Sequence, residues 1–257
     1  MPKKTYETET ALVIRSDDAK QVAKKIATLK SIDEYRLVPE RVQYIHDVLF
    51  DTPARTLSAR KMALRIRRIN GKYLITLKSP SHARAGGANK RLEIELPWSR
   101  QSLKKVLGEL GKKKIKTDKP TGDFTDPIKA MARLGFEIVQ DRKTKRLVRK
   151  VELAKQVYAE LAIDSVTFRF SDQVVRLREI EIESKSQEQP GTLERVVNGL
   201  KKAFQPILQT WESKLQTGKA IQELLRRGTL QEHLDDDDQL TDRAFNLLRA
   251  YFKQEGD

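Results

Sequence analysis

Charged and apolar side chains alternate in several short segments of the sequence, and this alternation is the pattern most able to support chemistry. In the segment ALRIRRI, Leu64 and Ile66 alternate with Arg65 and Arg67. Successive side chains of a β-strand point to opposite faces, so a strand here would place both arginines on one face. Three other segments repeat the alternation with mostly acidic residues in the charged column: Glu7 and Glu9; Arg91, Glu93 and Glu95; Glu179, Glu181 and Glu183.

Such columns need a neutralising partner, because like charges at every second position of a strand repel one another. A solvated sheet face explains any one of these strands, but four of them together favour a ligand. Carboxylates without histidine or cysteine select Mg²⁺ or Mn²⁺ over zinc, and arginine matches phosphate oxygens. The combination predicts a site for a complex of a divalent metal and a triphosphate, and a barrel could wrap the columns around a lumen.

The composition restricts the function classes further. The 257 residues carry a formal charge of +15, which attracts polyanions, but only 6% of residues are aromatic and no base-stacking motif is present, which argues against nucleic acid. The absence of cysteine excludes disulfide scaffolds, thiolate zinc sites and cysteine nucleophiles. No apolar run reaches the roughly 18 residues of a membrane helix, and the start has no signal-like stretch, so we expect a cytoplasmic protein without a membrane partner.

Periodicity predicts mainly antiparallel β-structure with helices inserted and appended, an α+β protein. The expected strands cover residues 6–15, 42–50, 63–69, 72–78, 90–98, 144–153, 157–170 and 174–184. The expected helices begin after Ser16-Asp17-Asp18 and cover much of 100–135, 193–204, 211–227 and 240–252. Asn70-Gly71 predicts a tight hairpin turn.

An ordered set of motifs resembles the CYTH domain of the triphosphate tunnel metalloenzymes. ETETA is similar to the family's opening E-x-E-x-K motif, and the stretch from VLFDTP through ALRIRRI to TLK is similar to its strand–turn–hairpin stretch. RLEIEL, RKTKR, AELAIDSVTF, REIEIESK and WESKLQTG resemble later blocks in the family's order, so the resemblance covers about Tyr6 to Gly218. It implies an eight-stranded tunnel-like barrel with a charged lumen and covering helices. The family includes thiamine triphosphatases, inorganic triphosphatases and class IV adenylate cyclases.

The resemblance also implies roles for the charged residues, with Mg²⁺ or Mn²⁺ as cofactor. The expected metal ligands are Glu7, Glu9, Glu93, Glu95, Glu181 and Glu183. The expected phosphate-binding residues are Arg65, Arg67, Lys78, Arg91, Arg146 and Lys185. The expected catalytic residues are Glu179, Glu181 and Lys214, since a late glutamate could orient or deprotonate the attacking water. Asp164 matches a late family aspartate and fits a turn residue equally well.

One departure concerns the opening motif, where Ala11 stands in place of the family lysine. The leading expectation is a metal-dependent triphosphatase acting on inorganic or organic triphosphate. Because of Ala11, a polyphosphate or nucleotide binding protein without catalytic turnover is an alternative. A class IV type adenylate cyclase is another alternative.

Other features are expected to be structural. Asp51-Thr52-Pro53 is typical of a turn, His46 of a strand residue with a satisfied hydrogen bond, and Asp235–Asp238 of a solvated linker. We expect a CYTH-like domain over residues 1–218, with a helical insertion at about 100–135, followed by a helical tail over 219–257. The sequence does not indicate an oligomeric state.

Overall fold

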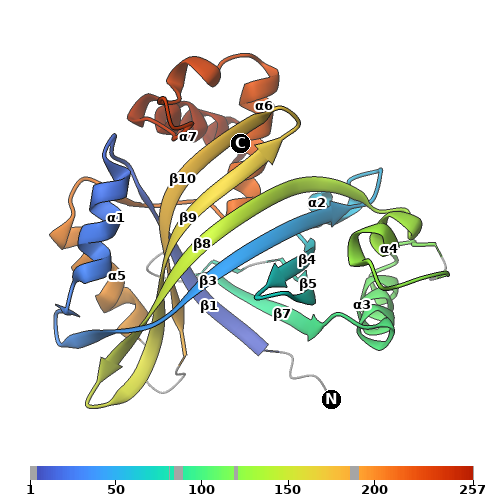
Figure 1. The fold of residues 1–257 in the computed structure, drawn as a ribbon, viewed down its shortest axis with the longest axis horizontal. Coiled ribbons are helices and arrows are strands. Elements are labelled where there is room, and N and C mark those ends of the chain that lie inside the picture. The colour runs from blue at the N-terminus through green and yellow to red at the C-terminus, as the bar shows by residue number, and fades with distance from the viewer. Residues whose placement is uncertain (1–4, 81, 84–88, 119–120, 186–190, 257) are drawn as a thin grey trace. The chain divides into compact units, whose positions relative to one another are not determined.

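The computed structural model of the protein describes residues 5–80, 82–83, 89–118, 121–185 and 191–256 (Figure 1). Its strands are β1 (Thr5–Ile14), β2 (Ser31–Ile32), β3 (Tyr35–Asp51), β4 (Ala63–Ile69), β5 (Lys72–Lys78), β6 (His82–Ala83), β7 (Asn89–Pro97), β8 (Glu137–Leu153), β9 (Gln156–Phe170), β10 (Gln173–Ser184) and β11 (Leu208–Thr210). Its α-helices are α1 (Ala19–Thr28), α2 (Thr56–Ala59), α3 (Arg100–Lys112), α4 (Pro127–Arg133), α5 (Thr192–Ala203), α6 (Lys214–Arg226) and α7 (Asp242–Gly256), and a 3₁₀ turn covers Gln231–His233.

The expected α+β, mainly antiparallel architecture is confirmed. The strands follow one another in the order β11-β1-β10-β9-β8-β3-β4-β5-β7-β6, β2 pairs with β3, and β1 makes an additional pairing with β7. Among the described residues the end strands β11 and β6 do not pair with each other, so the sheet is not closed through its ends. All eight expected strands are present, as β1, β3, β4, β5, β7, β8, β9 and β10.

The strands expected from the sequence leave out the first parts of β3 and β8 and the whole of β11. Strand β3 begins at Tyr35 rather than near residue 42, and β8 begins at Glu137 rather than at 144. Residues 208–210 form the short strand β11 beside β1, and the helix expected from 211 begins at Lys214. These segments are held by pairing with strands distant in the chain, which local periodicity does not reveal.

The chain divides into two compact units. The first comprises residues 1–7, 44–83 and 89–143, and the second comprises residues 8–43, 84–88 and 144–257. The first therefore holds β4 to β7 with α2, α3 and α4, and the second holds β9, β10 and β11 with α1, α5, α6 and α7.

In the first unit, one face of β4 and β5 packs under helices. Leu64, Ile66, Ile75 and Leu77 are buried in a cluster that also holds Leu103 of α3. Arg65 and Arg67, which alternate with Leu64 and Ile66, must therefore point to the other face of the strand. The turn between β4 and β5 confirms the Asn-Gly prediction, since both residues have positive φ (49° and 78°), as a tight hairpin turn requires.

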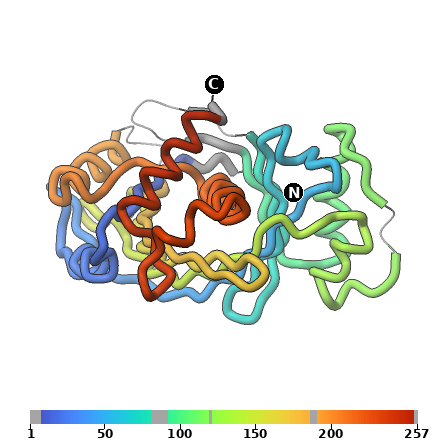
Figure 2. Tube along the Cα trace, turned by 90° about the horizontal axis from the view of Figure 1, so that it is seen from above, coloured from blue at the N-terminus to red at the C-terminus, as the bar shows by residue number. Residues whose placement is uncertain are grey.

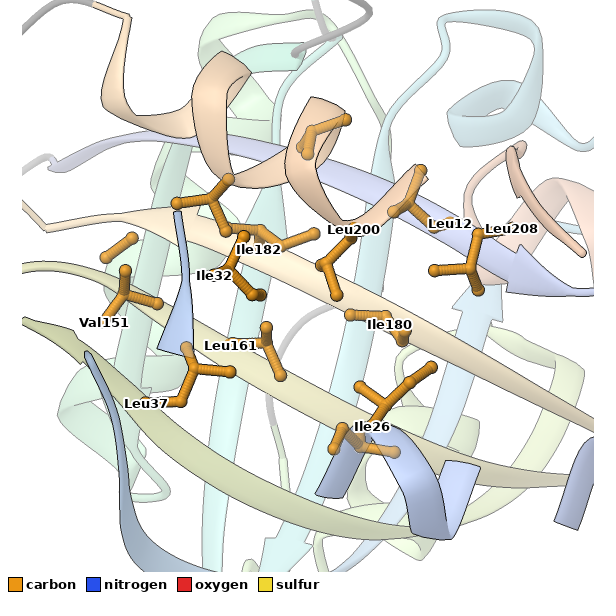
Figure 3. Close-up of a cluster of buried hydrophobic side chains, with 14 of the residues drawn as sticks. Leu12, Ile26, Ile32, Leu37, Val151, Leu161, Ile180, Ile182, Leu200 and Leu208 are labelled. Carbon is orange, nitrogen blue, oxygen red and sulfur yellow. The ribbon is translucent and has the colours of Figure 1, made fainter. Parts of the chain in front are cut away.

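In the second unit, α1 and α5 cover one face of the sheet (Figure 3). Leu12, Ile180 and Ile182 of β1 and β10 pack there against Ile26 of α1 and Leu200 of α5. Helix α1 begins where the sequence predicts, because the Asp18 side chain accepts a hydrogen bond from the amide of Gln21.

The opposite face of β9 and β10 is polar at one end and apolar at the other. Asp164, Val166 and Phe168 share this face by alternation, and the last two are buried against α6 and α7 together with Leu177. Helices α6 and α7 contact each other and are the orange and red segments of Figure 2. The boundary expected at 218/219 falls inside α6, whose buried residues include Ala220. The C-terminal helices thus cover the apolar end of the face and leave its carboxylates at the other end.

Candidate active site

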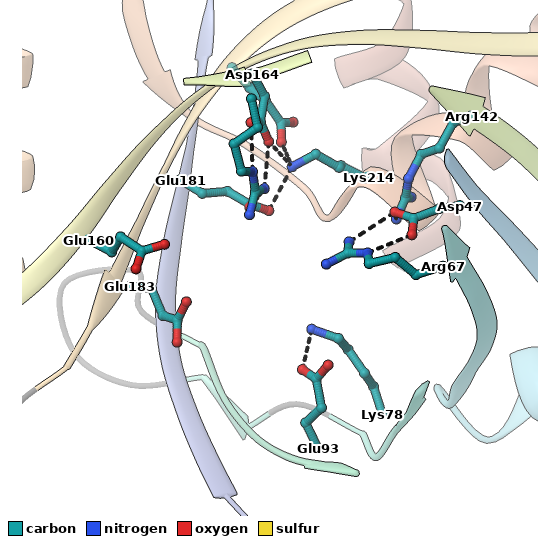
Figure 4. A network of polar contacts seen from close by, with 12 residues as sticks. Asp47, Arg67, Lys78, Glu93, Arg142, Glu160, Asp164, Glu181, Glu183 and Lys214 are labelled. Atoms are coloured by element: carbon teal, nitrogen blue, oxygen red, sulfur yellow. Dashed lines mark hydrogen bonds and ion pairs between the residues drawn. The ribbon is translucent and has the colours of Figure 1, made fainter. Parts of the chain in front are cut away.

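In the first unit, Arg65 and Arg67 lie on one face of β4 and contact carboxylates of β3 and β7, and Figure 4 shows the contact of Arg67 with Asp47. Arg67 donates to Asp47 of β3 from Nε (2.8 Å) and from Nη2 (3.0 Å). Arg65 Nη2 lies 3.4 Å from Glu93 and 3.2 Å from Glu95, both on β7. Arg65 therefore forms ion pairs with the acidic column that the sequence singled out, whereas Arg67 pairs with a carboxylate outside that column.

Lys78 completes this group of the first unit. Its ammonium lies 2.5 Å from Glu93 Oε2, and Glu93 is buried. The hydroxyl of Thr76 donates to Glu95 (2.9 Å). Because Glu93 and Glu95 contact protein cations, both carboxylates are already compensated here, and their role as metal ligands stays a prediction.

In the second unit, three carboxylates converge on the polar face of β9 and β10. Asp164 and Glu179 are direct partners in the antiparallel register, and Glu181 follows two residues later on the same face. One oxygen of each lies within 4.8 Å of the others. Asp164 and Glu179 are completely buried, and Glu181 is half-buried.

Lys214 places its ammonium between these carboxylates. It lies 3.1 Å from Asp164 Oδ2 and 2.7 Å from Glu181 Oε1, and it forms an ion pair with Glu179. Lys214 is the first residue of α6, where the Ser213 side chain accepts from the amide of Gln216. This N-terminal cap fixes the point at which the helix begins and so fixes the lysine.

Arg146 of β8 is the second cation of this group. It donates to both oxygens of Asp164 (2.8 and 2.6 Å) and also to Glu181. Burial raises the pKa of Asp164, but the charges of Arg146 and Lys214 outweigh burial and lower the pKa to about 2. Burial likewise acts to lower the pKa of Arg146, yet Asp164 and Glu181 hold that pKa well above its usual value. Asp164 and Arg146 are therefore both ionised.

A second row of carboxylates lies one step along the same strands. Glu9 of β1 pairs in register with Glu183, which pairs in turn with Glu160 of β9. Lys185 lies 2.9 Å from Glu183 and 3.7 Å from Glu160. Arg41 lies 2.9 Å from Glu160. The structure therefore brings the expected metal ligands Glu9 and Glu183 together with Lys185, beside rather than inside the group of Asp164.

Ala11 stands directly opposite Glu181 in the register of β1 and β10. A lysine at this position would extend from the same strand face toward that carboxylate. Here Glu181 is contacted by Lys214 and Arg146 instead. Two cations from other elements, Lys214 of α6 and Arg146 of β8, therefore already contact the carboxylate that a lysine at position 11 would face.

The carboxylate group of the second unit fits a hard divalent cation. Both oxygens of Glu179 are buried; Oε1 forms the ion pair with the Lys214 ammonium, and Oε2 has no hydrogen-bond donor. Buried acceptors without donors are costly, and oxygen donors in this number are what Mg²⁺ and Mn²⁺ take from proteins. Asp164, Glu179 and Glu181 are the residues that would hold such an ion.

Two features expected to be structural are so. The Asp51 carboxylate is buried and accepts from the amides of Thr52, Leu57 and Ser58, which organises the turn into α2. His46 Nε2 lies 2.8 Å from an Asp141 oxygen.

The acidic run 235–238 is a turn held to the sheet. Asp235 accepts from the amides of Asp237 and Gln239, and Asp238 pairs with Arg176 of β10. Residues 235–237 are exposed, as expected of a solvated segment, but these contacts make the run an ordered turn. The side chains of Glu7 and Arg91, which the sequence also selected, lie outside the described residues.

Sequence reasoning missed Asp47 and Arg142, which contact each other (3.2 Å) and are both buried. A signal was present for each. Asp47 interrupts the apolar strand YIHDVLF, and Arg142 belongs to the polar alternation Gln140, Arg142, Thr144 that leads to Arg146. The sequence does not show which residue a single charged side chain of this kind will contact, so the pairing of Asp47 with Arg142 is visible only in the structure.

None of the helices in the described part of the chain has the length and apolar character needed to cross a bilayer. No curated protein matches the sequence. Among solved structures, the proposed adenylyl cyclase HpAC1 from Hippeastrum, reported to have a dominant triphosphatase activity, is 20% identical with a TM-score of 0.52, over 87% of this chain and 97% of that one. A proposed adenylate cyclase from Bacillus halodurans is 19% identical with a TM-score of 0.49, over 82% and 97%.

The likeness to HpAC1 shows a common fold. The model of the CYTH domain matches residues 7–216, close to the span of the sequence resemblance. That span includes the arginines of β4, the carboxylates of β9 and β10, and Lys214. On this match over most of its length, the chain belongs to the CYTH domain family.

Proposed function

We propose that the protein is a metal-dependent triphosphatase, which hydrolyses inorganic triphosphate or an organic or nucleoside triphosphate. The observation that carries the proposal is the group of Asp164, Glu179 and Glu181 with Lys214 and Arg146. It combines oxygen ligands for a divalent ion with cations that match phosphate oxygens, all within one unit. Membership of the CYTH domain family supports this use of the group.

Each residue has a role in phosphoryl transfer, which depends on positioning and charge stabilisation more than on covalent chemistry. Asp164, Glu179 and Glu181 would hold Mg²⁺ or Mn²⁺, which supplies charge neutralisation at phosphate oxygens. Arg146 donates through a planar guanidinium and binds phosphate while it keeps Asp164 ionised. Lys214, whose backbone is fixed at the start of α6, supplies an ammonium group on a flexible side chain. Glu179 or Glu181 can accept the proton of the attacking water.

Arg65, Arg67 and Lys78 of the first unit support the same function. Arginine pairs bidentately with phosphate oxygens as it does with carboxylates. The contacts of these residues with Asp47, Glu93 and Glu95 show that their side chains are held in place before a substrate arrives. Such preorganised cations stabilise the charge that develops in the transition state.

The test is release of phosphate from tripolyphosphate, ATP and thiamine triphosphate with Mg²⁺, with Mn²⁺ and with chelator. Inorganic phosphate is the product of a triphosphatase, whereas pyrophosphate with cyclic AMP indicates a cyclase. We expect phosphate, loss of activity with chelator and loss in Glu179→Gln. Glu232→Gln, which removes an exposed carboxylate of the C-terminal region, is the matched control.

A binding protein without turnover is the second candidate, and Ala11 is the observation that favours it. The family motif has a lysine here, and its absence removes one cation opposite Glu181. Tight binding of tripolyphosphate without release of phosphate under any metal condition would support this candidate and exclude the first.

A further inference from the structure

The carboxylate of Asp47 lies among three guanidiniums in the first unit. Arg67 donates to both of its oxygens, Arg142 Nη2 donates to Oδ2 (3.2 Å), and Arg65 Nε lies 3.9 Å from Oδ1. The arginines come from β4 and β8, and Asp47 comes from β3 (Figure 4). Asp47 is 2% exposed and Arg142 is 4% exposed. These four side chains form a cluster of charged groups that is largely buried.

The cluster holds more positive than negative charge. Burial raises the pKa of Asp47, but Arg67, Arg65 and Arg142 outweigh burial and hold that pKa well below its usual range, so the carboxylate is ionised. Burial and repulsion by Arg65 and Arg67 lower the pKa of Arg142, against the attraction of Asp47. Arg65 shares its charge with Glu93 and Glu95. Three guanidiniums around Asp47 therefore leave positive charge that an anion can neutralise.

Two donors of the cluster are also unused. The Nε atoms of Arg65 and Arg142 are buried and have no hydrogen-bond partner. A buried donor without an acceptor costs free energy that a bound oxyanion would recover. Arg149 Nε is also buried without a partner, but its guanidinium donates to the carbonyls of Ala27 and Leu37, so Arg149 is structural. Arg142 differs because its charge adds to those of two neighbouring arginines.

We propose that Arg142 binds a phosphoryl group of the substrate together with Arg65 and Arg67, and that Asp47 positions the three guanidiniums for it. The ligand is an oxyanion with at least two charges, such as one phosphoryl group of a linear triphosphate. The inference rests on the proposed function and adds a phosphate-binding residue that the sequence did not select. Asp47 acts through the arginines and does not itself touch the anion, since two anions would repel.

The central variant is Arg142→Gln, with Lys143→Gln as its control. Lys143 is the next residue of β8, is exposed, and lies on the opposite face, so both variants remove one positive charge. We measure the dissociation constant of tripolyphosphate by titration calorimetry with chelator present, and KM and kcat with metal. Arg142→Gln should weaken binding roughly tenfold to hundredfold, the usual range for one charged hydrogen-bonding group, and Lys143→Gln less than twofold.

Asp47→Asn tests the positioning role. Removing a negative charge raises the local positive charge, so a purely electrostatic role predicts tighter binding of tripolyphosphate and an unchanged kcat. A positioning role predicts that kcat falls at least tenfold while KM changes much less, and that Asp47→Glu recovers part of kcat. An unchanged kcat in Asp47→Asn overturns this part of the proposal.

Circular dichroism and thermal unfolding show whether the variants fold. If Arg142→Gln does not fold, Arg142→Lys replaces it, which keeps the charge but loses the planar array of donors, and it should bind several-fold more weakly than wild type. Binding of tripolyphosphate to the Arg142 variant as tightly as to Lys143→Gln overturns the assignment while the proposed function stands. If the wild-type protein neither binds nor hydrolyses tripolyphosphate, ATP or thiamine triphosphate, the proposed function itself is wrong.

Discussion

Replacing Lys214 with methionine tests the central charge arrangement of the second unit. The substitution keeps most of the side-chain volume and removes the ammonium that contacts Asp164, Glu179 and Glu181. Asp164 and Glu181 keep Arg146 as a partner. Glu179, which is 1% exposed, loses the ion pair that compensates its charge.

An uncompensated buried charge of this kind costs about 3–5 kcal/mol of stability. For a chain of this length, that corresponds to a melting temperature lower by roughly 6–20 °C. Unfolding is compared at pH 8 and at pH 5. Lys202→Met, which removes an exposed cation from α5, is the control and should change stability by less than about 0.5 kcal/mol.

A divalent ion can replace the lost positive charge, so Mg²⁺ should stabilise Lys214→Met more than it stabilises the wild type. Saturation at about 100 times the dissociation constant adds on the order of 2.7 kcal/mol. The assay is urea and thermal unfolding of the three proteins at both pH values, with Mg²⁺ and with chelator. A Lys214→Met protein as stable as Lys202→Met would refute the compensation argument, and equal stabilisation of all three by Mg²⁺ would refute the competition between ammonium and metal.

Three other perturbations follow from the same contacts. Asp164, with its pKa lowered to about 2, contributes stability above about pH 4 that is lost as the pH falls toward 2, so the wild type should exceed Asp164→Asn by roughly 2–3 kcal/mol at pH 7 and by progressively less in acid, measured by urea unfolding. Ala11→Lys should not raise the rate of phosphate release, because Lys214 and Arg146 already contact Glu181; a tenfold gain would show that the site lacks a cation. In the Lys214→Met background, however, Ala11→Lys should restore on the order of 1 kcal/mol of stability. Gly71→Ala should cost about 1 kcal/mol in thermal unfolding, since φ is 78° there, and an unchanged melting temperature would contradict the turn assignment.

The sequence predicted the fold well wherever a strand or helix has a strong local pattern. Alternation located all eight main strands, and Asp18 and Asn70-Gly71 located a helix start and a hairpin turn correctly. It failed where tertiary pairing overrides local preference. The first half of β3 contains Pro39 and the exposed charged residues Arg36, Glu40 and Arg41, and it is a strand because β2 and the sheet hold it there.

The site could be predicted by residue type but not by partner. Alternation correctly placed Arg65 and Arg67 on one face of β4, opposite the buried Leu64 and Ile66. It did not show that Arg67 would pair with Asp47, because that contact depends on the register of β3 against β4. The same holds for Lys214, whose contact with Glu179 joins a helix start to a strand 35 residues earlier in the chain. Register and helix position are long-range properties, and a single sequence records neither.

The charged columns were expected to need external counter-ions, and the structure shows that the protein supplies many of them itself. In the first unit, Arg65, Arg67, Lys78 and Arg142 face Asp47, Glu93 and Glu95, which leaves an excess of one positive charge. In the second unit, Asp164, Glu179 and Glu181 face Arg146 and Lys214, which leaves an excess of one negative charge. Each group therefore keeps a residual charge of opposite sign after its internal pairing. A phosphate chain suits the first excess and a divalent ion suits the second, so within each unit it is the residual charge, rather than the column itself, that supports the ligand proposed for that unit.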